Sequence, residues 1–153
     1  MAKLSRLRDN SLMKYQRLDG NVSALRVMRG EEIVSSVLHF ATEEKIVSGI
    51  VMLIGAVSDI ELGFYDVNSK EYIWKKFSGD HEIVSAIGNV TLLGKNPFLH
   101  LHAVIADREF HTYGGHVKRA IAGATAEIIV HAGELPLYRA MDSDIGLNLW
   151  KIE

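Results

Sequence analysis

Residues 98–106 read Phe-Leu-His-Leu-His-Ala-Val-Ile-Ala, a pattern that repeats every two positions. Side chains two apart on a β-strand point to the same face, so the pattern predicts a strand. One face carries only apolar residues, namely Leu99, Leu101, Ala103 and Ile105. The other face carries Phe98, His100, His102 and Val104. The two imidazoles therefore share a face, about 7 Å apart at Cα, and can both reach one metal ion.

A third histidine follows two glycines in Gly114-Gly115-His116, fourteen residues after His102. If a neighbouring strand carries His116, its imidazole can join the first two in a facial set of three nitrogen ligands. Such a set leaves one coordination position open, as in zinc sites that bind or transform a ligand. Histidines two apart also occur as hydrogen-bonded polar residues on a solvated face, and two glycines also form a turn. The spacing alone leaves these interpretations open.

Short apolar segments separated by turn residues dominate the chain after Gly49. The expected strands are 22–28, 49–57, 59–67, 71–77, 81–93 with a break near Gly88, 98–106, 109–113, 122–132 and one near 146–152. The expected turns lie at 66–69, 78–80, 94–97 and 114–115. Glu31–Lys45 has an apolar stripe at helical spacing and predicts one helix. Short turns favour antiparallel pairing, so we expect an α+β domain in which one main helix packs on an antiparallel sheet.

The size of the chain and its lack of cysteine limit the possible architectures and sites. A chain of 153 residues is expected to form a single domain, which we place at 15–153 after a basic extension at 1–14. Without cysteine, a metal ion can be held only by His, Asp or Glu. The longest apolar run, 49–57, is too short to cross a bilayer, and no apolar segment follows the basic N-terminus. We therefore expect a cytoplasmic protein with no membrane partner.

Charge is unevenly distributed along the chain. Residues 1–30 carry a net charge of +5, and the remainder carries −7. A basic arm can contact phosphates of nucleic acid, whereas an acidic body repels them. A solvated or partner-packed extension explains the same basic residues, and this is the interpretation we favour.

Glu127 is the acidic residue that the pattern places closest to the candidate chemistry. It shares one face of strand 122–132 with Thr125, Ile129 and His131. A carboxylate there could orient an imidazole, serve as a fourth ligand or act as a general base. It could equally pair with a Lys or Arg on the sheet face. The remaining histidines, His39, His81, His111 and His131, are expected to be structural or exposed.

Several elements taken in order resemble one known family. These are Gly55-Ala-Val57 followed by Ser58, Gly79-Asp-His-Glu-Ile-Val-Ser85, His100-Leu-His102, Gly114-Gly-His116 and Thr125-Ala-Glu127. The set is similar to the PPC (plants and prokaryotes conserved) domain over residues 15–135. Plant members are AT-hook nuclear proteins, and stand-alone prokaryotic members are often labelled PD1-like DNA-binding proteins.

The resemblance implies a compact α+β fold assembled as a homotrimer. It also implies a zinc site at His100, His102 and His116, and it makes Glu127 a candidate catalytic residue near that site. One departure concerns DNA. The Arg-Gly-Arg-Pro core by which an AT-hook enters the minor groove is missing, and its nearest counterpart, Met28-Arg-Gly-Glu31, places an acid where an arginine is needed.

Three functional hypotheses follow. The first is a homotrimeric zinc-binding protein that holds a small ligand at a three-histidine site. The second is a DNA-binding or architectural protein that acts without an AT-hook and binds DNA weakly. The third is a zinc-dependent hydrolase or lyase in which Glu127 accepts a proton. We rank them in this order, and the sequence names neither a substrate nor an activity.

Overall fold

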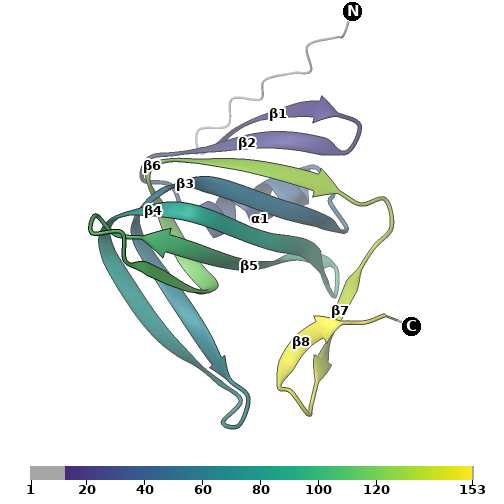
Figure 1. Cartoon of the computed structure of the whole chain (residues 1–153). Helices are drawn as coiled ribbons and strands as arrows, with labels where there is room; N and C mark the ends of the chain where they lie inside the picture. Colours follow the sequence, from purple (N-terminus) through teal and green to yellow (C-terminus); the bar gives the residue numbers. More distant parts are fainter. Residues whose placement is uncertain (1–12, 153) are drawn as a thin grey trace, which may run out of the picture.

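The computed structural model describes residues 13–152, which form one sheet-dominated α+β structure (Figure 1). The elements are β1 (Met13–Asp19), β2 (Val22–Met28), α1 (Ile33–Glu43), β3 (Gly49–Asp66), β4 (Glu71–Leu93), β5 (Asn96–Ala106), β6 (Thr112–Ala132), β7 (Tyr138–Asp142) and β8 (Leu147–Trp150). Most of the expected extension at 1–14 lies outside the described residues. Its last two positions, Met13 and Lys14, belong to β1, a strand that the sequence did not predict.

The sheet closes on itself through β6. This long strand pairs with β5 near its start, with β3 along most of its length and with β2 near its end. Because β3 also pairs with β4, and β4 with β5, these four strands form a closed circuit, and β1 and β2 extend the sheet beyond β6. These pairings are all antiparallel, as expected.

Helix α1 covers the buried face of the sheet, behind the strands in the view of Figure 1. Its residues Ile33, Val37 and Phe40 are at most 1% exposed and belong to the core that also contains Leu101 of β5. The helix is shorter at each end than the expected 31–45. Glu32 lies outside it because its carboxylate caps the first turn, accepting hydrogen bonds from the backbone N–H groups of residues 34 and 35.

Three expected strand boundaries are wrong. Segments 49–57 and 59–67 form the single strand β3, segments 71–77 and 81–93 form β4, and segments 109–113 and 122–132 form β6. The glycine-rich stretches at 78–80 and 114–115 are not turns, and the expected break near Gly88 lies within β4. The register of β3 shifts as in a β-bulge near Gly55 and near Ser58, and against β6 also between Glu61 and Leu62. Such irregularities bend long strands so that the sheet can close.

The strand at 98–106 is confirmed. It lies within β5, and Leu99, Leu101, Ala103 and Ile105 are all at most 8% exposed on the core face. The turns expected at 66–69 and 94–97 also separate strands, with the second confined to residues 94 and 95. Within residues 13–152 no helix is long and apolar enough to cross a membrane.

The C-terminal hairpin of β7 and β8 lies beside the end of β4 (Figure 1). Strand β7, which the sequence did not predict, pairs in parallel with Leu92 and Leu93. The hairpin is also attached to the end of the long β3–β4 hairpin, because the Tyr65 hydroxyl donates a hydrogen bond of 2.6 Å to the carbonyl of Ile145. These contacts place β7 and β8 next to the histidine-bearing face of β5.

Candidate metal centre

Strands β5 and β6 bring His100, His102 and His116 together. His102 and His116 are direct cross-strand partners, and His100 lies two residues from His102 on the same face. One ring nitrogen of each residue lies within 4.8 Å of the others, and the Nε2 atoms of His100 and His102 are 3.1 Å apart. Two nitrogen ligands of a tetrahedral zinc ion lie about 3.3 Å apart, so the pair already has nearly the spacing of ligands.

The two glycines before His116 permit close strand packing rather than a turn. A Cβ at Gly115 would lie 2.8 Å from the carbonyl oxygen of Gly63 in β3, closer than real Cβ contacts allow. A Cβ at Gly114 would lie 3.3 Å from the carbonyl oxygen of Ala103 in β5. Because β6 runs tightly between β3 and β5 here, His116 is placed opposite His102. The sequence left open whether a neighbouring strand carries His116 and placed residues 114–115 in a turn, whereas both glycines and His116 lie within β6.

Aromatic side chains of β4 support the third imidazole. The rings of Tyr72 and Trp74 stack with centroids 4.5 Å apart, and the Tyr72 ring lies 5.2 Å from that of His116. Gly63 makes room for them, since a Cβ there would lie 2.5 Å from the Trp74 ring. Sequence reasoning missed both aromatics, although their spacing of two residues within an expected strand placed them on one face.

Burial favours the neutral form of all three imidazoles. Burial lowers the pKa of His100 below its usual 6.5, with smaller contributions from His102 and Arg139. Burial also lowers the pKa of His102. For His116, burial is again the main cause, and with the neighbouring His100, His102 and Arg139 it lowers the pKa to about 4. A neutral imidazole has the free lone pair that a metal ion requires.

The donor set fits a zinc ion. The Nδ1 atom of His116 is buried, and within residues 13–152 it has no hydrogen-bond partner. A buried polar atom without a partner is costly, and a metal ion or its bound ligand would satisfy it. Three imidazoles, with no fourth ligand grouped with them among residues 13–152, match zinc sites that keep one position open.

Arg139 of β7 lies beside the cluster and is only 8% exposed. Its guanidinium donates hydrogen bonds to the Thr91 hydroxyl at 2.8 Å, the Asn89 side-chain oxygen at 2.7 Å and the carbonyl of Asn148 at 2.7 Å. It also lies over the Phe98 ring, 5.0 Å from its centroid. Asn89, which accepts one of these hydrogen bonds, is the cross-strand partner of His100 on β5. The guanidinium is therefore linked through a single side chain to the strand pair that carries the candidate ligands.

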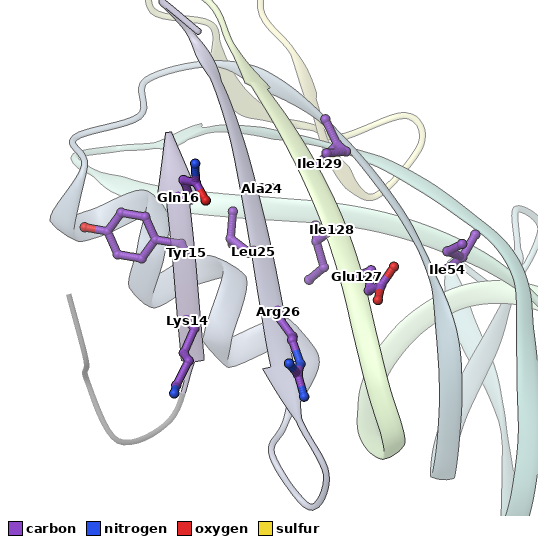
Figure 2. Close-up of a pocket in the computed structure, with 10 residues that line it drawn as sticks. All are labelled: Lys14, Tyr15, Gln16, Ala24, Leu25, Arg26, Ile54, Glu127, Ile128 and Ile129. Carbon is purple, nitrogen blue, oxygen red and sulfur yellow. The ribbon is translucent and has the colours of Figure 1, made fainter. Parts of the chain in front are cut away.

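Glu127 lies elsewhere on the molecule. It is an exposed residue of β6, between Arg26 of β2 and Ile54 of β3, and it lies eleven positions after His116 along β6. It lines a different pocket, of about 450 Å³, together with Lys14 and Arg26 (Figure 2). Within one chain the structure therefore does not bring Glu127 into the group of candidate ligands.

The other histidines lie outside the cluster. His39 faces Glu43 at 3.4 Å within α1, and His111 faces Asp107 at 3.3 Å in the loop before β6. The Nδ1 atom of His81 lies 2.9 Å from the carbonyl of Gly79, and His131 is exposed near the end of β6.

A family model described as the Plants and Prokaryotes Conserved (PCC) domain matches residues 15–134. The chain belongs to this family. The resemblance of the ordered motifs is thereby confirmed, and the abbreviation PPC is kept for the family below. A comparison of this PPC protein with curated proteins finds no match.

Solved structures of similar chains share the fold. A proposed DNA-binding protein from Bacteroides thetaiotaomicron is 28% identical with a TM-score of 0.89, covering 92% of this chain and 98% of its own. A metal-containing protein from Archaeoglobus fulgidus is 32% identical with a TM-score of 0.81, covering 87% and 94%. A plant- and prokaryote-conserved protein from Pyrococcus horikoshii is 25% identical with a TM-score of 0.80, covering 95% and 99%.

Proposed function

We propose that this PPC protein is a homotrimeric zinc-binding protein whose zinc ion, held by His100, His102 and His116, binds a small ligand at its open coordination position. The observation that carries the proposal is the convergence of three imidazole ring nitrogens within 4.8 Å of one another. The similarity to a metal-containing protein from Archaeoglobus fulgidus supports it.

Each residue of the site has a distinct role in this proposal. The three imidazoles bind the ion, and the stacked Tyr72 and Trp74 fix the position of the His116 ring. When bound, the ion would act as a Lewis acid that attracts an anionic or carbonyl oxygen. Because the pairing of β5 and β6 brings the three histidines together before the ion binds, less conformational entropy is lost on binding.

Metal analysis tests the proposal directly. Purified protein is expected to carry close to one zinc ion per chain, and a variant with both His100→Ala and His102→Ala is expected to carry almost none. His111→Ala is the matched control, since His111 lies outside the cluster and faces Asp107. Full retention of zinc by the double variant would refute the assignment of these ligands.

An exposed apolar surface supports the homotrimer. On the same side of the sheet as His100 and His102, the side chains of Ile50, Met52, Ile54 and Ile87 on β3 and β4 are between 46% and 59% exposed. We call these four residues the apolar face. Contiguous exposed apolar side chains are typical of surfaces that other protein chains cover. We propose that neighbouring subunits cover the apolar face.

DNA binding is a second candidate function, because a relative that covers most of the chain is a proposed DNA-binding protein. The basic side chains of Lys14 and Arg26 stand at paired positions of β1 and β2 and line the pocket of Figure 2. The overall net charge of −2 opposes phosphate binding over the rest of the surface. We therefore place this function second. Hydrolase or lyase chemistry with Glu127 as the proton acceptor ranks third, because a neighbouring subunit would have to supply that carboxylate.

A further inference from the structure

We propose that the ligand of the metal centre is a small organic carboxylate, bound between the zinc position and Arg139 with its apolar part against Trp150. The inference rests on the proposed zinc site and names the class of ligand that this site would take. It is carried by a buried cation without a carboxylate partner and by the lining of the adjacent pocket.

Arg139 is a buried charge that lacks a counter-ion. Its three hydrogen-bond acceptors are a hydroxyl, an amide oxygen and a backbone carbonyl, and within residues 13–152 no carboxylate forms an ion pair with it. A buried charge is normally paired, because removal from water is costly. A zinc ion at the proposed site would add further positive charge beside Arg139, because neutral imidazole ligands do not compensate the charge of the ion. An anion at this place would balance both charges.

The guanidinium retains capacity to bind such an anion. A guanidinium carries five N–H donors, and the three hydrogen bonds of Arg139 leave two of them, one on each terminal nitrogen. Asn89 extends the donor set toward the pocket. Its side-chain oxygen accepts from Arg139, which leaves the amide NH₂ group as a donor on the side of His100. Charge-assisted hydrogen bonds from a guanidinium to a carboxylate are among the strongest in proteins.

A pocket of about 380 Å³ adjoins the candidate ligands. Its lining consists of Ile50, Ile87, Gly88, Asn89, His100, His102 and Trp150. None of these residues is acidic, so the lining offers donors and apolar surface but no anionic group. The volume lies near the lower end for small-molecule sites, which favours a ligand of few atoms.

The C-terminal hairpin forms one wall of this pocket through Trp150 of β8. Arg139 of β7 fixes the hairpin from within, because it binds the carbonyl of Asn148 on β8 and the side chains of β4. Arg139 does not line the pocket itself but is hydrogen-bonded to Asn89, which does, so the hairpin supplies both the apolar wall and a cation directly behind the lining. Ile50 and Ile87 also belong to the apolar face, so the pocket borders the proposed subunit contact.

Calorimetric titration of the zinc-loaded protein with isobutyrate tests the inference. Isobutyramide, which has the same shape without the charge, is the control ligand, and formate lacks the apolar part. We expect isobutyrate to bind at least about tenfold more tightly than either. Equal binding of isobutyrate and isobutyramide would overturn the inference, as would the absence of isobutyrate binding, which is the result expected if a carboxylate of a neighbouring subunit fills the pocket.

Substitutions test the contributions of the Arg139 cation and the Trp150 wall to ligand binding separately. Arg139→Gln is expected to weaken isobutyrate binding at least about tenfold, whereas Arg108→Gln, at an exposed arginine, leaves it unchanged. Trp150→Ala is expected to weaken isobutyrate binding more than formate binding, whereas Leu149→Ala on the same strand changes neither. If Arg139→Gln does not fold, Trp150→Ala and Arg139→Lys provide the test, the latter keeping the charge but losing the planar fork. Unchanged affinity in the folded variants would overturn the inference.

Zinc content measured on the same samples distinguishes the two proposals. If zinc-loaded protein binds no isobutyrate, only the carboxylate inference is refuted. If the protein neither contains nor takes up zinc, both the proposed metal site and the inference that rests on it are refuted.

Discussion

The imidazole of His116 has the most strongly altered environment of the three candidate ligands. It lies against the rings of Tyr72 and Trp74, close to His100, His102 and Arg139. Burial and these neighbours together disfavour its protonated form. At neutral pH a zinc ion would therefore not have to displace a proton from this ring.

The altered pKa of His116 predicts how stability depends on pH in the metal-free protein. The folded-state pKa is about 4, below the 6.5 of an unperturbed histidine. Between these values the unfolded chain binds more protons than the folded one, so the free energy of unfolding falls as the pH falls from 6.5 toward 4. Above 6.5 this contribution is fully present.

Urea unfolding of the metal-free protein at pH 7, 6 and 5 measures this effect. The variant His116→Leu removes the group and is expected to show a smaller loss of stability over the same range. His39→Leu is the control, because His39 lies on α1 away from the cluster. Identical pH dependence of the wild type and His116→Leu would contradict the account.

The sequence predicted the three histidines but not the residues around them. The period of two in 98–106 placed His100 and His102 on one face, and Gly114-Gly115 drew attention to His116. Arg139 gave no such signal, since it is a single arginine on a short strand that reaches the site through a parallel pairing with β4. Only the folded chain brings it beside Asn89 and His100.

At the scale of elements, Gly55 in β3 provides a test of how tightly the strands pack. It has a φ of +146°, and a Cβ there would lie 2.2 Å from the carbonyl oxygen of Thr125 in β6. Gly55→Ala is therefore expected to lower the free energy of unfolding by about 3 kcal/mol, because it adds a backbone clash to the backbone strain.

Gly79→Ala is the matched control in β4. Gly79 also has a positive φ, of +90°, but nothing lies within 4 Å of an added Cβ. The free energy of unfolding of this variant is expected to fall by only about 1 kcal/mol, which is the cost of the backbone strain alone. Denaturant unfolding compares the two, and equal losses would show that the contact between β3 and β6 is looser than described.

The strand boundaries illustrate what local sequence signals cannot determine. Glycine and aspartate at 78–80 favour a turn in an isolated segment, yet they continue β4 because β3 pairs with both halves. Strand β1 was missed because its exposed polar residues lack a clear alternation, and it forms by pairing with β2. Long-range pairing thus overrides local preference, whereas β2 and β5, with clear alternation, were predicted well.

For the whole molecule, the apolar face predicts the assembly. Light scattering is expected to give about three times the chain mass of 17.0 kDa. Met52→Glu, which places a charge on the apolar face, is expected to shift the protein toward monomer. Leu135→Glu is the control, since Leu135 is 79% exposed but lies in the segment after β6. A wild-type protein that is monomeric at micromolar concentration would refute the trimer.

The charge of the whole molecule predicts weak DNA binding. Near physiological salt, duplex DNA is expected to bind at or below the non-specific range of roughly 10⁻⁴–10⁻⁶ M. Because Met13 and Lys14 belong to β1, the deletion that tests the basic arm is limited to residues 2–12, which removes Lys3, Arg6 and Arg8. We expect this deletion to remove most of the binding to both A·T-rich and G·C-rich duplexes. Nanomolar, A·T-selective binding that survives it would make DNA recognition the primary function.

The most direct test of the metal centre is anomalous diffraction from crystals of the zinc-loaded protein, recorded on both sides of the zinc absorption edge. We expect one strong peak per chain, about 2.0–2.1 Å from one ring nitrogen each of His100, His102 and His116. The absence of a peak between these rings, or a peak held by other residues, would contradict it.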